Sequence, residues 1–195
     1  RGFYSSAKLK ADQIMAEAIT NGKMPVINLR PGTIWGPGGK FFTPLLGFSL
    51  GNRLFAVIGD GKFVLPYVYI DNLVEAITRA IENRDIAGGI YNVVDLERIT
   101  KREYVERLVK KLYPGAICIY IPYSIFYSTV YIQEKLFSWL GRKPVLTRYR
   151  LISSQKNILY DSSKIQRELG WKAPVSPEEG IQIVLTHERG RHRLD

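Results

Sequence analysis

Residues 29–39 are Leu29-Arg30-Pro31-Gly32-Thr33-Ile34-Trp35-Gly36-Pro37-Gly38-Gly39, and the three residues before them are Val26-Ile27-Asn28. The apolar run from 26 to 29 predicts a buried strand. We expect the chain to leave the sheet directly after it as a loop, because proline lacks an N–H and glycine adopts backbone angles that other residues avoid. In α/β proteins, such carboxyl ends of parallel strands carry the chemistry.

The segment before this strand predicts a helix from Tyr4 to about Asn21. Small residues recur on it at helical spacing and predict a stripe that lies close on the sheet, formed by Ala7, Ala11, Ile14 and Ala18. Tyr4 and Lys8 lie one turn apart on the same face. An ammonium beside a phenol favours the phenolate, so this pair is a candidate for proton transfer near neutral pH.

The spacing Tyr-x-x-x-Lys is a weak signal on its own, because it occurs three times, at Tyr4/Lys8, Tyr131/Lys135 and Tyr160/Lys164. Only the first pair is followed by a buried strand and by the segment rich in proline and glycine. We therefore single out Tyr4 and Lys8, and interpret the other two pairs as surface coincidences.

The composition is that of a globular protein with a core of its own. Of the 195 residues, 46% are hydrophobic and 24% are charged. One cysteine rules out an internal disulfide framework and fits a reducing, cytoplasmic compartment. The two histidines, His187 and His192, lie in a charged tail without ligand spacing, so no metal is expected. The net charge is +10, but the basic residues are scattered, which predicts a basic surface and no nucleic-acid partner.

Local patterns predict the elements that follow. Residues 41–54 favour a loop or a short helix, and residues 55–58 and 63–70 favour two strands joined by the tight turn Gly59-Asp60-Gly61. Asp71 is placed to cap the next helix, whose expected buried face is Ala76, Ile77, Ala80 and Ile81. Residues 90–94 predict another strand. Two capping-box patterns each open a further helix, at Thr100–Glu103 and Ser176–Glu179.

Residues 112–133 contain no charged side chain and many aromatic ones. About 20 residues can cross a bilayer, but Pro114, Gly115 and Pro122 interrupt this segment. We therefore expect a strand over 117–121, followed by a helix from Tyr123. Its aromatic side chains either pack in a core, which we prefer, or line an apolar substrate pocket or a membrane-facing surface.

An ordered set of motifs resembles the carboxyl-terminal portion of the extended short-chain dehydrogenase/reductase family. The family includes NAD-dependent epimerases and dehydratases and enzymes similar to 3β-hydroxysteroid dehydrogenase. The matching segments are Tyr4-Ser5-Ser6-Ala7-Lys8, residues 29–38, Ile58-Gly59-Asp60-Gly61, Tyr67-Val68-Tyr69-Ile70-Asp71-Asn72, Gly89-Ile90-Tyr91-Asn92-Val93 and residues 161–180. The resemblance covers essentially the whole chain. Because the chain also starts at Arg1 without a methionine, we expect it to be part of a longer protein.

The resemblance implies an α/β fold. Residues 1–35 and about 64–95 would supply part of a Rossmann-like, doubly wound parallel sheet. Residues from about 36 to 63 and from 96 to 195 would mainly supply the elements of a small α/β substrate-binding subdomain.

The resemblance also implies catalytic roles. Tyr4 would exchange a proton with a substrate hydroxyl or carbonyl while hydride passes to or from NAD or NADP. Lys8 would lower the pKa of Tyr4 and bind the nicotinamide ribose. The segment Pro31-Gly32-Thr33-Ile34 would pack beside the nicotinamide. For Arg30 we prefer an ion pair that steadies this segment.

Two departures from the family pattern bear on function. No Gly-x-x-Gly-x-x-Gly turn occurs in these residues, so the chain alone should bind a dinucleotide poorly. Nucleotide-sugar members commonly carry an arginine where this chain has Leu65-Pro66-Tyr67. Leu65 and the apolar segment 117–132 look closer to the members that act on hydroxysteroids. We expect substrate contacts at Trp35, Arg53, Leu65 and Arg148, with Arg150 as a further candidate.

Three functions stay open at this point. The first is part of an NAD(P)-dependent oxidoreductase that acts on a secondary alcohol or carbonyl of a small, apolar substrate. The second is a nucleotide-sugar epimerase or dehydratase. The third is a truncated, non-catalytic binding module, which the retained Tyr4 and Lys8 disfavour. The expected partner is a small-molecule substrate, with peripheral membrane contact and a homodimer as open alternatives.

Overall fold

In the computed structural model, β1 (Ile27–Pro31) continues after one residue into β2 (Thr33–Trp35). The structure describes residues 3–22, 26–83, 88–144 and 146–191, the side chains of residues 3, 4 and 150 excepted. β1 pairs in parallel with β6 (Gly89–Val93), and β2 pairs in parallel with β5 (Tyr67–Tyr69). The expected loop after residue 29 is therefore wrong over residues 30–35. The chain instead passes from one strand partner to the next, since the N–H of Gly32 donates to Val93 and that of Thr33 to Pro66.

The chain divides into two compact units. Unit 1 contains Arg1–Gly36, Pro66–Arg98 and Leu159–Gly180, and unit 2 contains Pro37–Leu65, Ile99–Ile158 and Ile181–Asp195. The last segment of unit 1 differs from our expected division, which placed residues 159–180 among the substrate-binding elements. The assignment of cofactor and substrate roles to the two sets of segments stays a prediction.

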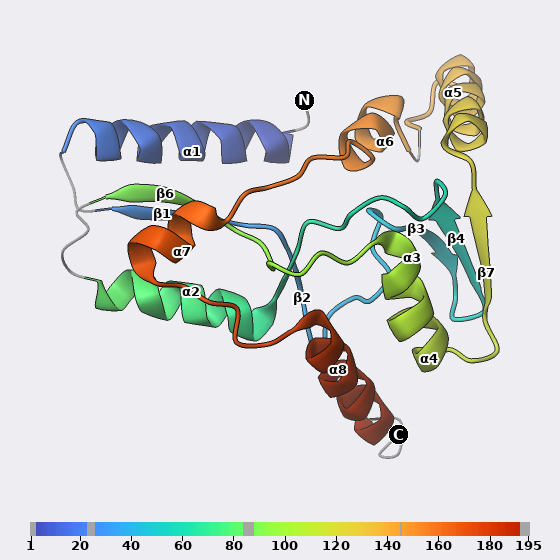
Figure 1. The fold of residues 1–195 in the computed structure, drawn as a ribbon. Helices are drawn as coiled ribbons and strands as arrows, with labels where there is room; N and C mark the ends of the chain where they lie inside the picture. The colour runs from blue at the N-terminus through green and yellow to red at the C-terminus, as the bar shows by residue number, and fades with distance from the viewer. Residues whose placement is uncertain (1–2, 23–25, 84–87, 145, 192–195) are drawn as a thin grey trace. The chain divides into compact units, whose positions relative to one another are not determined.

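Unit 1 is layered around the parallel pair β1–β6. The helix α1 (Phe3–Thr20) lies along one face, and α2 (Ile70–Glu82) and α7 (Ser163–Leu169) cover the other (Figure 1). Between these helices and the strands lies an apolar core, which consists of Val68, Leu73, Ala76, Tyr91, Val93, Ile165, Leu169 and Trp171. The α/β class with parallel strands is thus confirmed.

Unit 2 contains a three-stranded sheet in the order β3-β4-β7. β3 (Gly47–Leu50) is antiparallel to β4 (Leu54–Ile58), and β7 (Ile117–Ile121) is parallel to β4. The helices of this unit are α3 (Lys101–Tyr104), the π-helical turn η1 (Val105–Val109), α4 (Lys110–Leu112), α5 (Tyr123–Trp139) and α6 (Arg148–Ser154). α8 (Pro177–Arg191) begins in unit 1 and belongs to unit 2 from Ile181 onward.

Two strand predictions are wrong. The loop expected over 41–54 contains β3, and the hairpin expected around Gly59-Asp60-Gly61 does not form. Residues 61–65 instead run beside the start of α3, with the N–H of Leu65 donating to Ile99 and that of Lys101 to Phe63. Partners distant in sequence thus take the hydrogen bonds that a hairpin would have used. The strand over 117–121 and the helix from Tyr123 are confirmed.

Helix caps are predicted better than buried faces. Both capping boxes form, since Thr100 and Glu103 bond reciprocally, as do Ser176 and Glu179. The cap at Asp71 is wrong, because α2 begins at Ile70 with Tyr69 at the cap position, and no side chain caps it. Ala76 is buried, but Ile77 and Ile81 are exposed. On α1, three members of the expected buried stripe are exposed, namely Ala7, Ala11 and Ile14.

Candidate functional site

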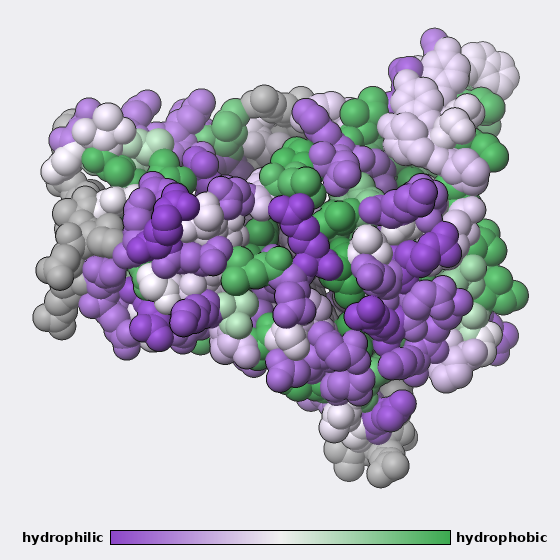
Figure 2. Space-filling view, viewed as in Figure 1, coloured by the Kyte–Doolittle hydropathy of each residue, from purple (hydrophilic) through white to green (hydrophobic). Residues whose placement is uncertain are grey.

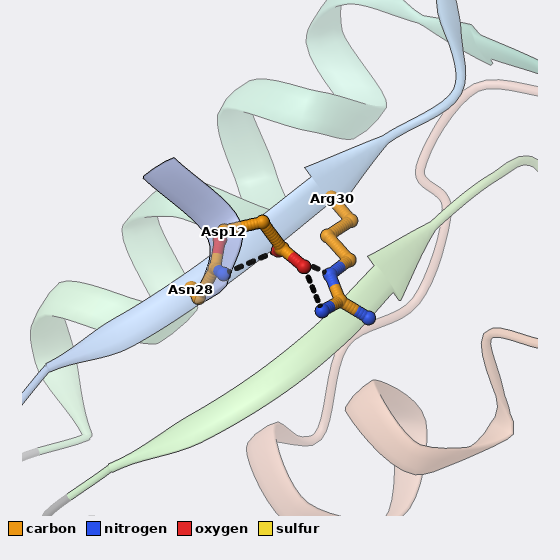
Figure 3. A network of polar contacts seen from close by, with 3 residues as sticks. All are labelled: Asp12, Asn28 and Arg30. Atoms are coloured by element: carbon orange, nitrogen blue, oxygen red, sulfur yellow. Dashed lines mark hydrogen bonds and ion pairs between the residues drawn. The ribbon is translucent and has the colours of Figure 1, made fainter. Parts of the chain in front are cut away.

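The candidate site begins where α1 crosses β1. Asn28 and Arg30 lie two residues apart on β1 and therefore point to the same side of the strand. Both reach Asp12 of α1, as Figure 3 shows. The amide of Asn28 donates to Asp12 Oδ1 at 2.9 Å, while Arg30 donates from Nε to Oδ1 at 2.7 Å and from Nη2 to Oδ2 at 2.5 Å.

This network holds Asp12 in its ionised form. The hydrogen bonds from Arg30 lower the pKa of Asp12 below its usual range, and the amide of Asn28 adds to the effect. The predicted ion pair at Arg30 is confirmed, with Asp12 as its partner. Sequence reasoning missed Asp12, although it stands one helical turn after Lys8 on α1, which is a usable signal.

A cavity of about 740 Å³ lies between α1 and the end of β1. It brings together four of the residues predicted to bind the cofactor, namely Lys8, Pro31, Gly32 and Ile34, and adds Asp12. Ile34 is half exposed and presents an apolar surface. Tyr4 lies in the first turn of α1, but its side chain is outside the described part of the structure.

Thr33, the remaining predicted cofactor residue, lines a second cavity of about 440 Å³ with Pro66, Asn92 and Tyr160. Pro31 and Gly32 border both cavities. A Cβ on Gly32 would lie 2.3 Å from the carbonyl oxygen of Pro66. The close approach of these two backbone segments therefore requires glycine at this position.

Trp35 is almost fully buried at the end of β2, with 5% of its surface exposed. Its indole packs edge-on against Tyr69, with ring centres 5.1 Å apart. Asp95 accepts a hydrogen bond from the indole of Trp35 at 3.4 Å. It also accepts from the backbone N–H of Tyr69 at 3.0 Å and from the side-chain amide of Asn72 at 2.8 Å. Burial raises the pKa of Asp95, and these hydrogen bonds oppose that rise.

Asn72 uses both ends of its side-chain amide. Its Nδ2 donates to Asp95 and to the carbonyl of Val175, and its Oδ1 accepts from the N–H of Val175 at 2.9 Å. The carbonyl of Asn72 also accepts from the indole of Trp171. Sequence reasoning missed Asn72 and Asp95. The available signal was an acidic residue directly after a strand, at the carboxyl edge of the sheet.

The other predicted substrate residues belong to unit 2, where each has its own surroundings. Arg53 is exposed, and Leu65 is 4% exposed. Arg148 pairs with Glu134, which raises the pKa of Arg148, and its guanidinium lies 4.8 Å from the ring centre of Tyr131. Arg150 lies in α6 with its side chain outside the described part. Their roles stay predictions.

The second and third Tyr-x-x-x-Lys pairs make structural contacts. The ammonium of Lys135 lies 6.0 Å from the ring centre of Tyr131. Lys164 lies over a different tyrosine, Tyr91, at 4.8 Å. Neither pair borders the 740 Å³ cavity, whereas Lys8 does. This difference in position favours the first pair for chemistry.

Comparison with known proteins places these observations in a family context. Residues 1–93 match the NAD dependent epimerase/dehydratase family. Over 93% of its length, the chain is 30% identical to 3beta-hydroxysteroid-dehydrogenase/decarboxylase isoform 1 of Arabidopsis thaliana. Over 96% of its length, it is 28% identical to short-chain dehydrogenase/reductase family 42E member 1 of Homo sapiens.

The fold is also found among solved structures. UDP-glucuronic acid 4-epimerase from Bacillus cereus, solved with UDP-glucuronic acid and NAD, superposes over 96% of the chain with a TM-score of 0.63 and 18% identity. The chain spans about half the length of the proteins it matches, covering 44% of the plant protein, 52% of the human protein and 52% of the epimerase.

Proposed function

Because the chain belongs to the extended short-chain dehydrogenase/reductase family, we propose that it is part of an NAD(P)-dependent oxidoreductase acting on a secondary alcohol or carbonyl. The observation that carries the proposal is the cavity that Lys8 shares with Pro31, Gly32 and Ile34. These residues come from a helix and a strand exit that are separate in sequence, and they surround one space.

The cavity residues fit the nicotinamide end of a dinucleotide. Lys8 offers an ammonium for ribose hydroxyls, Ile34 offers an apolar surface for a ring, and the cavity of about 740 Å³ gives both room. The bound nicotinamide would supply the hydride chemistry. Asp12 keeps the guanidinium of Arg30 on the α1 side of β1 and so steadies the wall of the cavity.

In this proposal, Tyr4 acts as the general acid or base. In the oxidative direction, Tyr4 takes the proton of the substrate hydroxyl. A hydride passes to the cofactor from the carbon that carries this hydroxyl, and that carbon becomes a carbonyl. Lys8 favours the phenolate because its positive charge stands one helical turn away. Lys8 thus has two roles, which are to hold the cofactor ribose and to lower the pKa of Tyr4.

A small apolar substrate is the preferred class. The plant relative at 30% identity is named for a hydroxysteroid, whereas the nucleotide-sugar epimerase shares 18% identity and supports the fold alone. Leu65 stands where nucleotide-sugar enzymes commonly carry an arginine, and it is buried here. A nucleotide-sugar epimerase or dehydratase is the alternative.

The test measures turnover by the protein in its complete natural form. Hydroxysteroids and other apolar secondary alcohols are offered with NAD and with NADP, and the reduced cofactor is followed by its absorbance. We expect Tyr4→Phe to lower turnover by about 100-fold or more, because general acid–base groups contribute that much. Tyr131→Phe is the matched control, since it alters the same Tyr-x-x-x-Lys spacing on α5 and should leave turnover unchanged.

A second measurement separates the two substrate classes. Ligands that bind the folded state raise its melting temperature. Protection by UDP-sugars, with no response to apolar alcohols, would overturn the substrate class and favour the epimerase. Equal turnover by wild type and Tyr4→Phe on an active substrate would overturn the catalytic assignment.

A further inference from the structure

α5 has an apolar side that no described residue of the chain buries. Ile125, Ile132, Leu136 and Trp139 recur at i, i+7, i+11 and i+14 and so form one stripe along the helix. Their exposed fractions are 59%, 63%, 49% and 83%. Leu140, directly after the helix, is 51% exposed. We call these five residues the α5 stripe.

The opposite side of α5 holds the helix to unit 2. Val130 is buried with Ile58 and Leu151, and Phe126 packs against this group. The ring of Phe126 also stacks on Phe48 of β3, with centres 5.3 Å apart. Because these contacts anchor α5 from one side, the α5 stripe is presented as a fixed surface.

Polar atoms along the α5 stripe are already satisfied. The hydroxyl of Ser128 donates to the carbonyl of Ser124 at 3.0 Å, and that of Thr129 donates to Ile125 at 2.8 Å. Only two of the 17 helix residues are charged, Glu134 and Lys135, and Glu134 is paired with Arg148. An apolar environment would therefore cover the α5 stripe at little cost in unmet hydrogen bonds.

The exposed charges around the α5 stripe are basic. Lys135 stands three residues after Ile132 and four before Trp139, and Arg142 and Lys143 follow the helix. All three are exposed. Figure 2 shows near-neutral and hydrophobic residues gathered over α5, at the upper right of the view. Tryptophan and leucine beside lysine and arginine are typical of helices that lie in a membrane interface.

We propose that the α5 stripe docks this protein onto the surface of an anionic lipid bilayer, with Lys135, Arg142 and Lys143 against the lipid headgroups. The exposed basic groups favour an anionic lipid surface as the partner, and a second copy of the chain is the outcome that the mass measurement below distinguishes. The proposed contact lies at the membrane surface. Within the described ranges, no helix is long and apolar enough to cross a membrane. This inference is independent of the proposed reaction.

Tryptophan fluorescence tests the proposal directly. Trp139 is 83% exposed, whereas Trp35 and Trp171 are buried, with exposed fractions of 5% and 0%. A change in tryptophan emission on binding therefore reports on Trp139. Vesicles of phosphatidylcholine with phosphatidylserine should shift the emission to shorter wavelength, and bromine on the acyl chains should quench it. Trp139→Phe should abolish both signals.

Sedimentation with the same vesicles measures the affinity. Ile132→Ser should weaken partitioning about tenfold, because it removes one large apolar side chain from the contact. Arg142→Gln and Lys143→Gln should each weaken it about fivefold, with little effect on pure phosphatidylcholine vesicles. Ile81→Ser is the matched control, because Ile81 of α2 is 73% exposed and lies outside the α5 stripe.

Three results would overturn the proposal. One is unchanged fluorescence with anionic vesicles. Another is unchanged partitioning of Ile132→Ser, with circular dichroism confirming that the variant is folded. The third is a blue shift that grows with protein concentration in the absence of lipid, together with a doubled mass in light scattering, which would assign the α5 stripe to a second copy.

Discussion

At the scale of single residues, the most consequential departure from simple burial rules is Lys101. Its side chain has no exposed surface. The ammonium donates to the carbonyl of Ile58 at 3.1 Å and to the side-chain oxygen of Gln155, and it lies 4.7 Å from the ring centre of Phe63. Burial lowers the pKa of Lys101 to about 8, against an ordinary value of 10.5.

The pKa of Lys101 predicts a pH dependence of stability. Between pH 8 and 10.5 the unfolded chain binds a proton at this lysine and the folded chain does not, so the free energy of unfolding rises with pH across that window. The slope is at most about 1.4 kcal/mol per pH unit. Urea unfolding of wild type and Lys101→Met at about pH 7.5 and about pH 9 checks this. The free energy of unfolding should rise less with pH in the variant, because the variant lacks the lysine that causes the rise. Equal slopes would show that Lys101 is charged in the folded state across the window.

At the scale of elements, Asn72 joins the start of α2 to the segment before α8. It is fully buried, and its neutral amide supplies two donors to Asp95 and Val175 while accepting from Val175. An aspartate of the same shape at this position would put a second carboxylate 2.8 Å from the first and face the carbonyl of Val175 with an acceptor. The neutral amide is therefore what allows these elements to meet.

We predict that Asn72→Asp destabilises the protein by about 2–4 kcal/mol at neutral pH, because it leaves buried groups unpaired beside a like charge. Proximity raises the pKa of the paired carboxyls, so stability is retained at low pH and lost as the pH rises through those values. Thermal melts from about pH 4 to about pH 7 should show the deficit growing with pH. Asn52→Asp, in the exposed turn between β3 and β4, should stay within about 0.5 kcal/mol of wild type. A deficit that does not depend on pH would argue against the two-carboxylate explanation.

At the scale of the whole molecule, the chain spans about half the length of its relatives. In the proposed function, the cavity beside Lys8 holds the nicotinamide end of a dinucleotide, but the sequence contains no Gly-x-x-Gly-x-x-Gly turn for the pyrophosphate. Phosphate binding by a helix amino terminus contributes much of the affinity for dinucleotides in this kind of fold. Under the proposed function, strong cofactor binding would therefore require a pyrophosphate site that these 195 residues do not contain.

The isolated 195-residue chain should accordingly bind NADH weakly, without saturation at micromolar concentrations. Calorimetric titration of this chain, with the complete natural protein titrated alongside, measures the difference. Saturable, tight binding by the isolated chain would contradict the prediction. Folding of the chain is checked in the same sample by its thermal transition.

Local chemistry was enough to predict several features of this protein. The helix from Tyr123, the strand Ile117–Ile121 and both capping boxes were predicted from local sequence patterns, and each is confirmed. The ordered motifs also predicted the family, which the match of residues 1–93 to the NAD dependent epimerase/dehydratase family and the likeness to the human relative support. The ion pair at Arg30 was expected, although its partner was not.

Contacts between distant residues decided the rest. β4 pairs with β3 and β7 rather than with residues 63–70. The backbone groups of Phe63 and Leu65 bond to Lys101 and Ile99 instead, and Tyr67–Tyr69 pair with β2. Asp12 meets Arg30 across two elements, and Asn72 meets Asp95 and Val175 across 23 and 103 positions. Lys101 resembles any surface lysine in the sequence, and its hydrogen-bond partners, Ile58 of β4 and Gln155 after α6, come from distant segments. Such partners carry no local pattern, since their energies exist only after the chain has folded.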